Sequence, residues 1–207
     1  MFRRLIAATA ACVLAATVSA ADYVAGTHYK ELSQPVRTAN PDKIEVVEVF
    51  WYGCIHCFNF EPKLKEWEKT LAEDVDFHQS PAMWNELMAL HARAFYAAEA
   101  LGKLEVMNGP LFEELNVKRK RLSSEDELAE LFVANGVDEA EFRKAFNSFG
   151  VKSKVKQADA RARGYQITGT PAVIVDGKYL VTAKGGYDEV LNVAEFLIEK
   201  ERQARSN

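Results

Sequence analysis

The sequence predicts an α/β fold with an inserted all-helical domain. Segments rich in β-branched and aromatic residues occur at 43–51 and 75–80, and again at 172–181. Between these groups, apolar residues recur at helical spacing and no convincing strand is present. A block of helices between strands indicates an insertion into one sheet-containing domain. The expected boundaries are 21–82 and 156–207 for the α/β domain and 83–155 for the helical domain.

The first twenty residues differ in character from the rest of the chain. Arg3 and Arg4 precede an apolar run from Leu5 to Thr17, and Val18-Ser19-Ala20 supplies small residues for cleavage. This pattern is typical of a secretory signal peptide, and the apolar run is shorter than the ~20 residues that span a bilayer. We therefore expect residues 1–20 to be removed on export.

The exported chain would carry a mild negative charge. Removing Arg3 and Arg4 from the 26 basic residues leaves 24 against 30 acidic residues, a net charge of −6. This balance gives no electrostatic reason to expect nucleic acid as a partner. No second apolar stretch approaches membrane-spanning length, so the processed protein is expected to be soluble.

The strand predicted at residues 43–51 leads into a helix. It is almost continuously apolar and β-branched, which is typical of a central strand, and Gly53 ends the run. From Cys57 to Leu71, apolar residues recur at helical spacing. Cys54-Ile55-His56-Cys57 is therefore expected where a strand ends and a helix begins.

Helices are predicted through the insertion. Glu86 to Leu101 is rich in Ala, Leu and Met, and Gly102 is a plausible C-cap. Gly109-Pro110 is expected to break the helical pattern, which starts again after it. Ser123-Ser124-Glu125-Asp126 is a start signal for the next helix. Two further helices are predicted at residues 137–149 and 152–163.

The end of the chain returns to strand and then to helix. Ala172 to Val175 and Lys178 to Val181 are short strands separated by Asp176-Gly177, which predicts a hairpin with a two-residue turn. Asp188 to Arg205 predicts an amphipathic closing helix.

Two cysteines, Cys54 and Cys57, remain once Cys12 has left with the signal peptide. A disulfide between them would close a ring so small that the chain-entropy gain is only about 2 kcal/mol. A zinc site needs about four ligands and would have to recruit distant histidines. A c-type haem motif requires His directly after the second cysteine, where this chain has Phe58. A passive disulfide stays open as an alternative, but the pattern favours a redox function and no metal.

The position of the pair supports the redox interpretation. Amide groups and the dipole at a helix N-terminus stabilise a thiolate on Cys54, the predicted nucleophile. Cys57, one helical turn further on, is the predicted resolving thiol that attacks a mixed disulfide. His56 is predicted to favour the Cys54 thiolate, although a surface histidine is the alternative. A strongly acidic Cys54 would stabilise the reduced protein and make the disulfide an oxidant.

Two more residues are candidates for the same site. Glu48 lies in the otherwise apolar strand, either facing outward or as a buried carboxylate beneath the cysteines. Strand alternation puts Glu45 and Glu48 on opposite faces, so both cannot point to solvent. Pro171 precedes the hairpin, and the sequence around it does not show whether it is an ordinary turn proline or a residue of the site.

These segments resemble the DsbA family of periplasmic disulfide oxidoreductases, which have a thioredoxin-like fold with a helical insertion. The resemblance extends over nearly the whole processed chain and is far more specific than a bare Cys-x-x-Cys. The most specific segments are Glu48–Glu61, Pro110–Glu113, Asn147–Phe149, Gly169–Ala172 and Asp176–Tyr179.

The resemblance implies a role for each residue of the site. Cys54 would be the exposed nucleophile, Cys57 its buried partner, and Glu48 the residue in the proton-transfer position. Thr170-Pro171 would be a cis peptide whose backbone pairs with an extended substrate segment. The family's usual dipeptide between the cysteines is Pro-His, whereas this chain has Ile55-His56. Ile55 therefore adds an amide donor and an apolar side chain beside the nucleophile, and we include it with Thr170 and Pro171 among the substrate-binding residues.

The expected function is donation of the Cys54–Cys57 disulfide to newly secreted, unfolded polypeptides in the periplasm. This disulfide would be the only cofactor, and a monomer is expected. The resemblance also implies reoxidation by a DsbB-like membrane partner. Two alternatives remain: a disulfide reductase or isomerase, and a peptide-binding chaperone in which the cysteines are incidental.

Overall fold

The computed structural model describes residues 23–206, so the predicted signal peptide lies outside the described residues. These residues form a five-stranded mixed sheet in the order β1-β5-β4-β2-β3. Strand β2 is parallel to β3 and antiparallel to β4. The strands are β1 (Lys30–Glu31), β2 (Ile44–Phe50), β3 (Val75–Pro81), β4 (Ala172–Val175) and β5 (Tyr179–Thr182).

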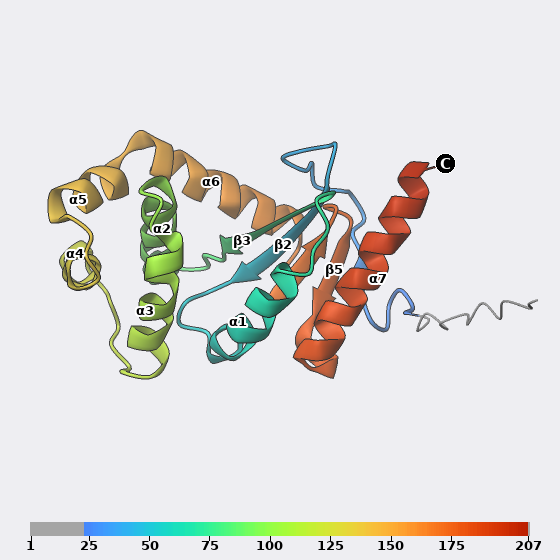
Figure 1. The fold of residues 1–207 in the computed structure, drawn as a ribbon, viewed down its shortest axis with the longest axis horizontal. Helices are drawn as coiled ribbons and strands as arrows, with labels where there is room; N and C mark the ends of the chain where they lie inside the picture. Colours follow the sequence, from blue (N-terminus) through green and yellow to red (C-terminus); the bar gives the residue numbers. More distant parts are fainter. Residues whose placement is uncertain (1–22, 207) are drawn as a thin grey trace, which may run out of the picture.

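Helices flank the sheet and form the insertion between β3 and β4 (Figure 1). Figure 1 shows the helices from α2 to α5 gathered at one end of the molecule, with α6 running from them back over the sheet. The prediction of an α/β, thioredoxin-like fold with a helical insertion is confirmed. The helices are α1 (Ile55–Glu68), α2 (Glu86–Ala100), α3 (Leu104–Asn116), α4 (Glu125–Ala134), α5 (Glu139–Asn147), α6 (Phe149–Gly164), the short η1 (Ala183–Gly185) and α7 (Tyr187–Ser206).

Each face of β2 packs against a different layer. Val46 belongs to the core that α1 and α7 form on one face, together with Leu64 and Leu197. Val47 belongs to the core on the other face, which includes Ala162 of α6. Because both faces are covered, every residue of β2 is buried, as expected for a central strand.

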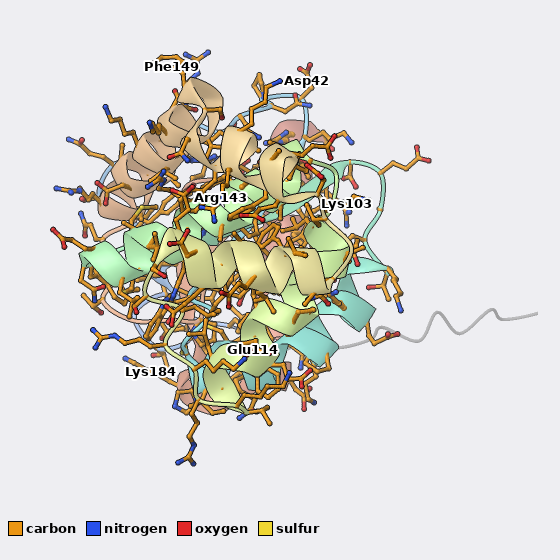
Figure 2. The ribbon with its side chains drawn as sticks, turned by 90° about the vertical axis from the view of Figure 1, so that its left-hand side faces the viewer. Asp42, Lys103, Glu114, Arg143, Phe149 and Lys184 are labelled. Atoms are coloured by element: carbon orange, nitrogen blue, oxygen red, sulfur yellow. The ribbon has the colours of Figure 1, made fainter. Side chains whose placement is uncertain are left out.

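Helix α6 contributes to two cores. Val151 and Ala158 pack in the core of the helical insertion, whereas Ala162 packs against the sheet. The helix is continuous to Gly164, so the predicted domain boundary at residue 155 falls inside it. Seen from the helical end, Lys103 and Arg143 lie on the surface and Phe149, at the start of α6, projects into solvent (Figure 2).

The expected interruption at Gly109-Pro110 is wrong. Helix α3 runs through both residues from Leu104 to Asn116. Proline removes one backbone hydrogen bond from a helix, but the neighbouring Met107 and Leu111 are fully buried in the core of the insertion. Their burial holds the helix together across the weak point.

Candidate active site

The cysteine pair lies where the sequence predicts it, at the start of a helix after a central strand. Cys54 is the N-cap of α1, with extended backbone angles of φ −89° and ψ 113°. The first amides of a helix have no partner within the helix, so they need an acceptor at this position. The Cys54 side chain makes no capping hydrogen bond, but the nearby backbone amides of His56 and Cys57 favour a negative charge on its sulfur.

Cys54 is a strongly acidic thiol. The protonated thiol donates to the Thr170 carbonyl, whereas the thiolate is favoured by the Cys57 thiol, the Thr170 side chain and the amides of Cys57 and His56. These donors lower the pKa of Cys54 from 9.0 to about 5, although partial burial opposes the shift. At neutral pH the side chain is therefore a thiolate, the form that reacts as a nucleophile.

Cys57 has the opposite character. It is fully buried, and burial raises the pKa of its thiol well above the ordinary value. Its hydrogen bond to Cys54 and the nearby negative charge of Glu48 raise that pKa further. One turn of helix thus holds an acidic thiol and a thiol that keeps its proton.

The acidity of Cys54 should depend on the Cys57 thiol as a donor. We expect Cys57→Ala to raise the pKa of Cys54 by at least one unit, because the largest favourable contribution is lost. Cys57→Ser is the matched control, since its hydroxyl keeps a donor at that position. The measurement is the pH dependence of alkylation of Cys54, and equal pKa values in the two variants would contradict this account.

Glu48 is a buried carboxyl beneath the cysteines rather than an outward-facing residue. Burial raises its pKa to about 8, and the charges of Glu61 and Cys54 act in the same direction. Its Oε2 accepts a hydrogen bond of 2.7 Å from Gln79 on β3, the only contribution that lowers the pKa. Glu48 is therefore mainly protonated at neutral pH.

Glu45 is equally buried but points to the opposite face of β2. There it accepts a hydrogen bond from the Ala39 amide and forms an ion pair with Arg161 of α6. The alternation predicted for the two glutamates is confirmed, and neither side chain reaches solvent. Glu45 joins α6 to the sheet, away from the chemistry.

The loop before β4 contacts the nucleophile directly. The peptide bond between Thr170 and Pro171 is cis, as the resemblance implies, and the Thr170 carbonyl oxygen lies 3.4 Å from the Cys54 sulfur. A groove of about 620 Å³ runs beside it, lined by residues that include His56, Pro171 and Tyr187. Ile55 is 48% exposed next to the nucleophile.

His56 contributes to the site in a way that the sequence does not predict. Its backbone amide helps to lower the pKa of Cys54, whereas its exposed ring lies with Nδ1 3.5 Å from the Tyr187 hydroxyl. The structure therefore brings the amide, rather than the imidazole, to the thiolate.

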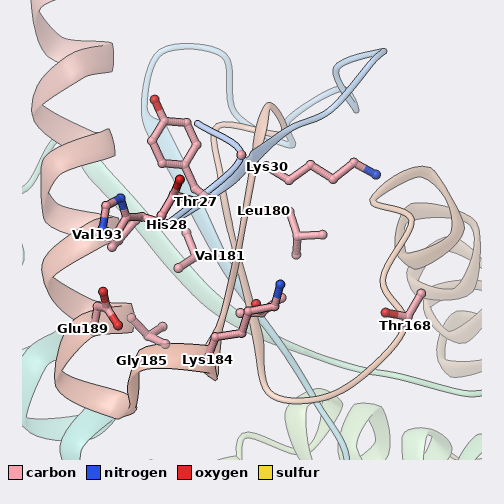
Figure 3. A pocket seen from close by; sticks show the side chains of 14 residues that line it. Thr27, His28, Lys30, Thr168, Leu180, Val181, Lys184, Gly185, Glu189 and Val193 are labelled. Atoms are coloured by element: carbon pink, nitrogen blue, oxygen red, sulfur yellow. The ribbon is translucent and has the colours of Figure 1, made fainter. Parts of the chain in front are cut away.

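A second pocket, of about 220 Å³, lies away from the cysteines (Figure 3). Figure 3 shows His28 and Lys30 of the N-terminal segment, Val181 of β5 and Glu189 of α7 around it. The pocket shares Thr168, Thr182 and Lys184 with the groove beside the cis peptide, so the two hollows are neighbours.

Residues 23–206 contain no group of three or more His, Cys, Asp or Glu side chains placed to hold a metal ion. Within the same range, no helix is both long and apolar enough to cross a membrane.

Sequence reasoning missed three polar residues that join Glu48 to its surroundings. Tyr52 donates to Asn108 over 2.7 Å, Asn108 donates to Glu61 over 2.5 Å, and Gln79 donates to both glutamates. They come from the loop before α1, from α3 and from β3, so no local spacing connects them. The one available signal was the position of Gln79 in a strand that could pair with the one carrying Glu48.

The site combines two thiols of opposite acidity in one helical turn with a carboxyl that is neutral at physiological pH. Thiol–disulfide exchange uses this asymmetry, because one sulfur must leave readily as an anion while the other takes up a proton. The fold and the site together define a thiol:disulfide oxidoreductase with a thioredoxin-like fold.

Comparison with known proteins gives the family. Residues 62–194 match the family model described as DSBA-like thioredoxin domain. The chain belongs to the DsbA family, as its sequence motifs suggested. Thiol:disulfide interchange protein DsbA of Pseudomonas aeruginosa is 40% identical over 185 residues, which cover 88% of each chain. The protein of the same name from Azotobacter vinelandii is 41% identical over 193 residues, 92% of this chain and 90% of the relative.

Solved structures agree with this assignment. The crystal structure of Pseudomonas aeruginosa DsbA matches with a TM-score of 0.86 at 40% identity, covering 89% of this chain and 97% of that one. The oxidoreductase DsbA from Xylella fastidiosa matches with a TM-score of 0.82 at 33% identity, covering 87% and 98%. The family model begins after the cysteine pair, so Cys54 and Cys57 are assigned from their place in this fold.

Proposed function

We propose that the protein is a dithiol oxidase that transfers the Cys54–Cys57 disulfide to pairs of thiols in exported polypeptides. The observation that carries the proposal is the acidic Cys54 at the N-cap of α1. A stabilised thiolate favours the reduced protein, so the disulfide is readily given up. No cofactor beyond this disulfide, and no metal, is required.

The transfer proceeds in two displacements. A substrate thiolate attacks the Cys54 sulfur, forming a mixed disulfide while the Cys54–Cys57 bond breaks and its electron pair leaves with Cys57. Because the pKa of Cys57 is raised, this sulfur takes up a proton, and the neutral Glu48 is the acid that supplies it. A second substrate thiolate then attacks the substrate sulfur of the mixed disulfide, and Cys54 leaves as the stabilised thiolate. The substrate loses two electrons and the cysteine pair gains them.

The groove beside the cis peptide fits an extended polypeptide. The backbone of Thr170 lies next to the Cys54 sulfur, where an added strand could form main-chain hydrogen bonds. The exposed Ile55 offers an apolar contact next to the sulfur, and the buried Pro171 contributes to the wall of the groove. This mode of binding recognises backbone more than side chains, which suits an enzyme with many unfolded clients.

The cellular setting is part of the proposal. The signal peptide expected at residues 1–20 would bring the enzyme to the periplasm, where disulfides persist. A membrane protein of the DsbB type would reoxidise the pair, and the enzyme would act as a monomer. The support is the family membership together with the N-terminal sequence pattern.

The test is a redox titration against glutathione, combined with unfolding of both redox forms. We expect the reduced protein to be the more stable form at pH 7. The folded pKa of Cys54 is depressed, so its stabilising contribution is complete above the unfolded thiol pKa of about 9 and disappears as pH falls through about 5. The stability difference should therefore shrink between pH 9 and pH 5. A more stable oxidised form at pH 7 would favour a reductase instead.

A further inference from the structure

Gln79 lies between the two buried carboxyls of the site. It faces Glu48 in the register of the parallel strands β2 and β3. Its amide nitrogen donates to Glu48 Oε2 over 2.7 Å and to Glu61 Oε2 over 2.8 Å. A primary amide has two hydrogens to donate, so these two bonds use both of them.

The orientation of the Gln79 amide is fixed from the helical insertion. Asn108 of α3 is 3% exposed, and its Oδ1 accepts a hydrogen bond from the Tyr52 hydroxyl. Its Nδ2 must then point the other way, where it donates to Glu61 Oε1 over 2.5 Å and approaches the Gln79 oxygen at 3.4 Å. With its oxygen facing a donor, Gln79 presents its nitrogen to the carboxyls.

This arrangement determines which oxygen of Glu48 carries the proton. Oε2 is occupied as an acceptor, so the proton of the neutral carboxyl resides on Oε1. The titratable groups that interact with Glu48 are Glu61 of α1, Tyr52 and the two cysteines, and its cross-strand neighbour on β4 is the apolar Val173.

Gln79 also lies between Glu48 and a pocket of about 170 Å³ that Glu48 does not line. The ionisable residues that line this pocket are Glu61, Lys65, Glu68, His78, Glu99 and Glu105, and Lys65 pairs with Glu61 and Glu105. A neutral amide donor at this point therefore holds Glu48 without adding a charge to it.

We propose that Gln79, oriented by Asn108, is a positioning residue that holds the Glu48 proton on the oxygen from which Cys57 receives it. The proposal rests on the dithiol oxidase function proposed above. Glu48 must be protonated when Cys57 leaves, so the oxidation rate per substrate thiolate falls as pH rises through the pKa of Glu48. Gln79 influences the pH at which the rate falls, because its hydrogen bond lowers the pKa of Glu48 whereas burial raises it.

The experiment compares Gln79→Met and Gln79→Lys in the full processed chain. Gln79→Met removes the amide hydrogens that Glu48 accepts but keeps a side chain of similar volume. The pH at which the oxidation rate falls should then rise by about one unit. Gln79→Lys places a cation beside Glu48 and should lower the pH at which the rate falls by at least one unit. Oxidation at pH 8 should then be about fivefold slower than in the wild type, or slower still. Gln157→Met, at an exposed position on α6, is the matched control and should leave the profile unchanged.

Two measurements are needed: the single-turnover oxidation of a dithiol peptide from pH 5 to 10, and the titration of Glu48 followed by carbon-13 NMR. The proposal is supported if, in both measurements, the Met variant shifts to higher pH and the Lys variant to lower pH. If the Met variant fails to fold, the Lys variant alone is sufficient for the test. An unmoved Glu48 titration, or a moved titration with an unmoved rate profile, would overturn it. A wild-type protein without oxidase activity at any pH would refute the proposed function, which is a separate outcome because the titration of Glu48 is still measured.

Discussion

Replacing Cys54 with serine is expected to slow oxidation of a dithiol peptide by at least about 10³-fold. A substrate thiolate must attack the Cys54 sulfur, and Cys54 must later leave as a thiolate. A hydroxyl can neither form the disulfide that carries the oxidising equivalents nor leave in this way. The measurement is the rate of peptide oxidation in glutathione buffer. Cys57→Ser is the matched control, because it also loses the disulfide but keeps a Cys54 that reacts with iodoacetamide at neutral pH.

The same variant separates the enzyme from a chaperone. If incidental cysteines lay beside a peptide-binding groove, Cys54→Ser would still assist the oxidative folding of a client as well as the wild type does. We expect that assistance to disappear, because the groove lies directly beside the nucleophile and serves it. Retention of full activity toward an unfolded client would exclude the oxidase.

Replacing Glu48 with glutamine is expected to stabilise the protein by about 3 kcal/mol at pH 7 and to have no such effect at pH 4. Burial raises the folded pKa of Glu48 to about 8 from an unfolded value of 4.5. The folded state therefore binds more protons between these values, and stability is lost as pH rises from 4.5 to 8. A neutral amide removes this loss, and it also removes the acid, so the oxidation rate should fall.

Urea unfolding of the wild type and the variant at pH 4, 7 and 9 measures this effect. Glu45→Gln is the matched control on the other face of β2. It breaks the ion pair with Arg161 and should destabilise the protein by about 2 kcal/mol across the same range, because it leaves a partly buried charge without its partner. Destabilisation by Glu48→Gln at pH 7 would show that its carboxyl is charged in the folded protein.

The sequence was sufficient for the local features of the site. The continuous apolar run of β2, the break at Gly53 and the helical spacing after Cys57 place the cysteines at a helix start. The turn signal at Asp176-Gly177 places the hairpin, but the two-residue turn predicted from it is wrong, because Val175 pairs with Tyr179 and residues 176–178 form the turn. Each of these depends on residues within a few positions of one another, where backbone preference and side-chain spacing act directly.

Features that depend on distant contacts could not be predicted in this way. Helix α3 survives Gly109-Pro110 because the insertion core buries its apolar side chains. Gln79 and Asn108 acquire their positions only when β3 and α3 come together beside Glu61. The burial of both Glu45 and Glu48 follows from the helices that cover the two faces of β2, which alternation alone does not reveal.

The shared helix α6 has a consequence for cooperativity. Its first half completes the packing of the insertion and its second half completes that of the sheet, so melting either region exposes apolar surface of the other. Arg161, on the same helix, would lose the carboxylate of β2 in the process. We therefore expect the two regions to unfold as a single thermodynamic unit, so that a mutation far out in the insertion also changes the stability of the region that holds the reactive sulfur.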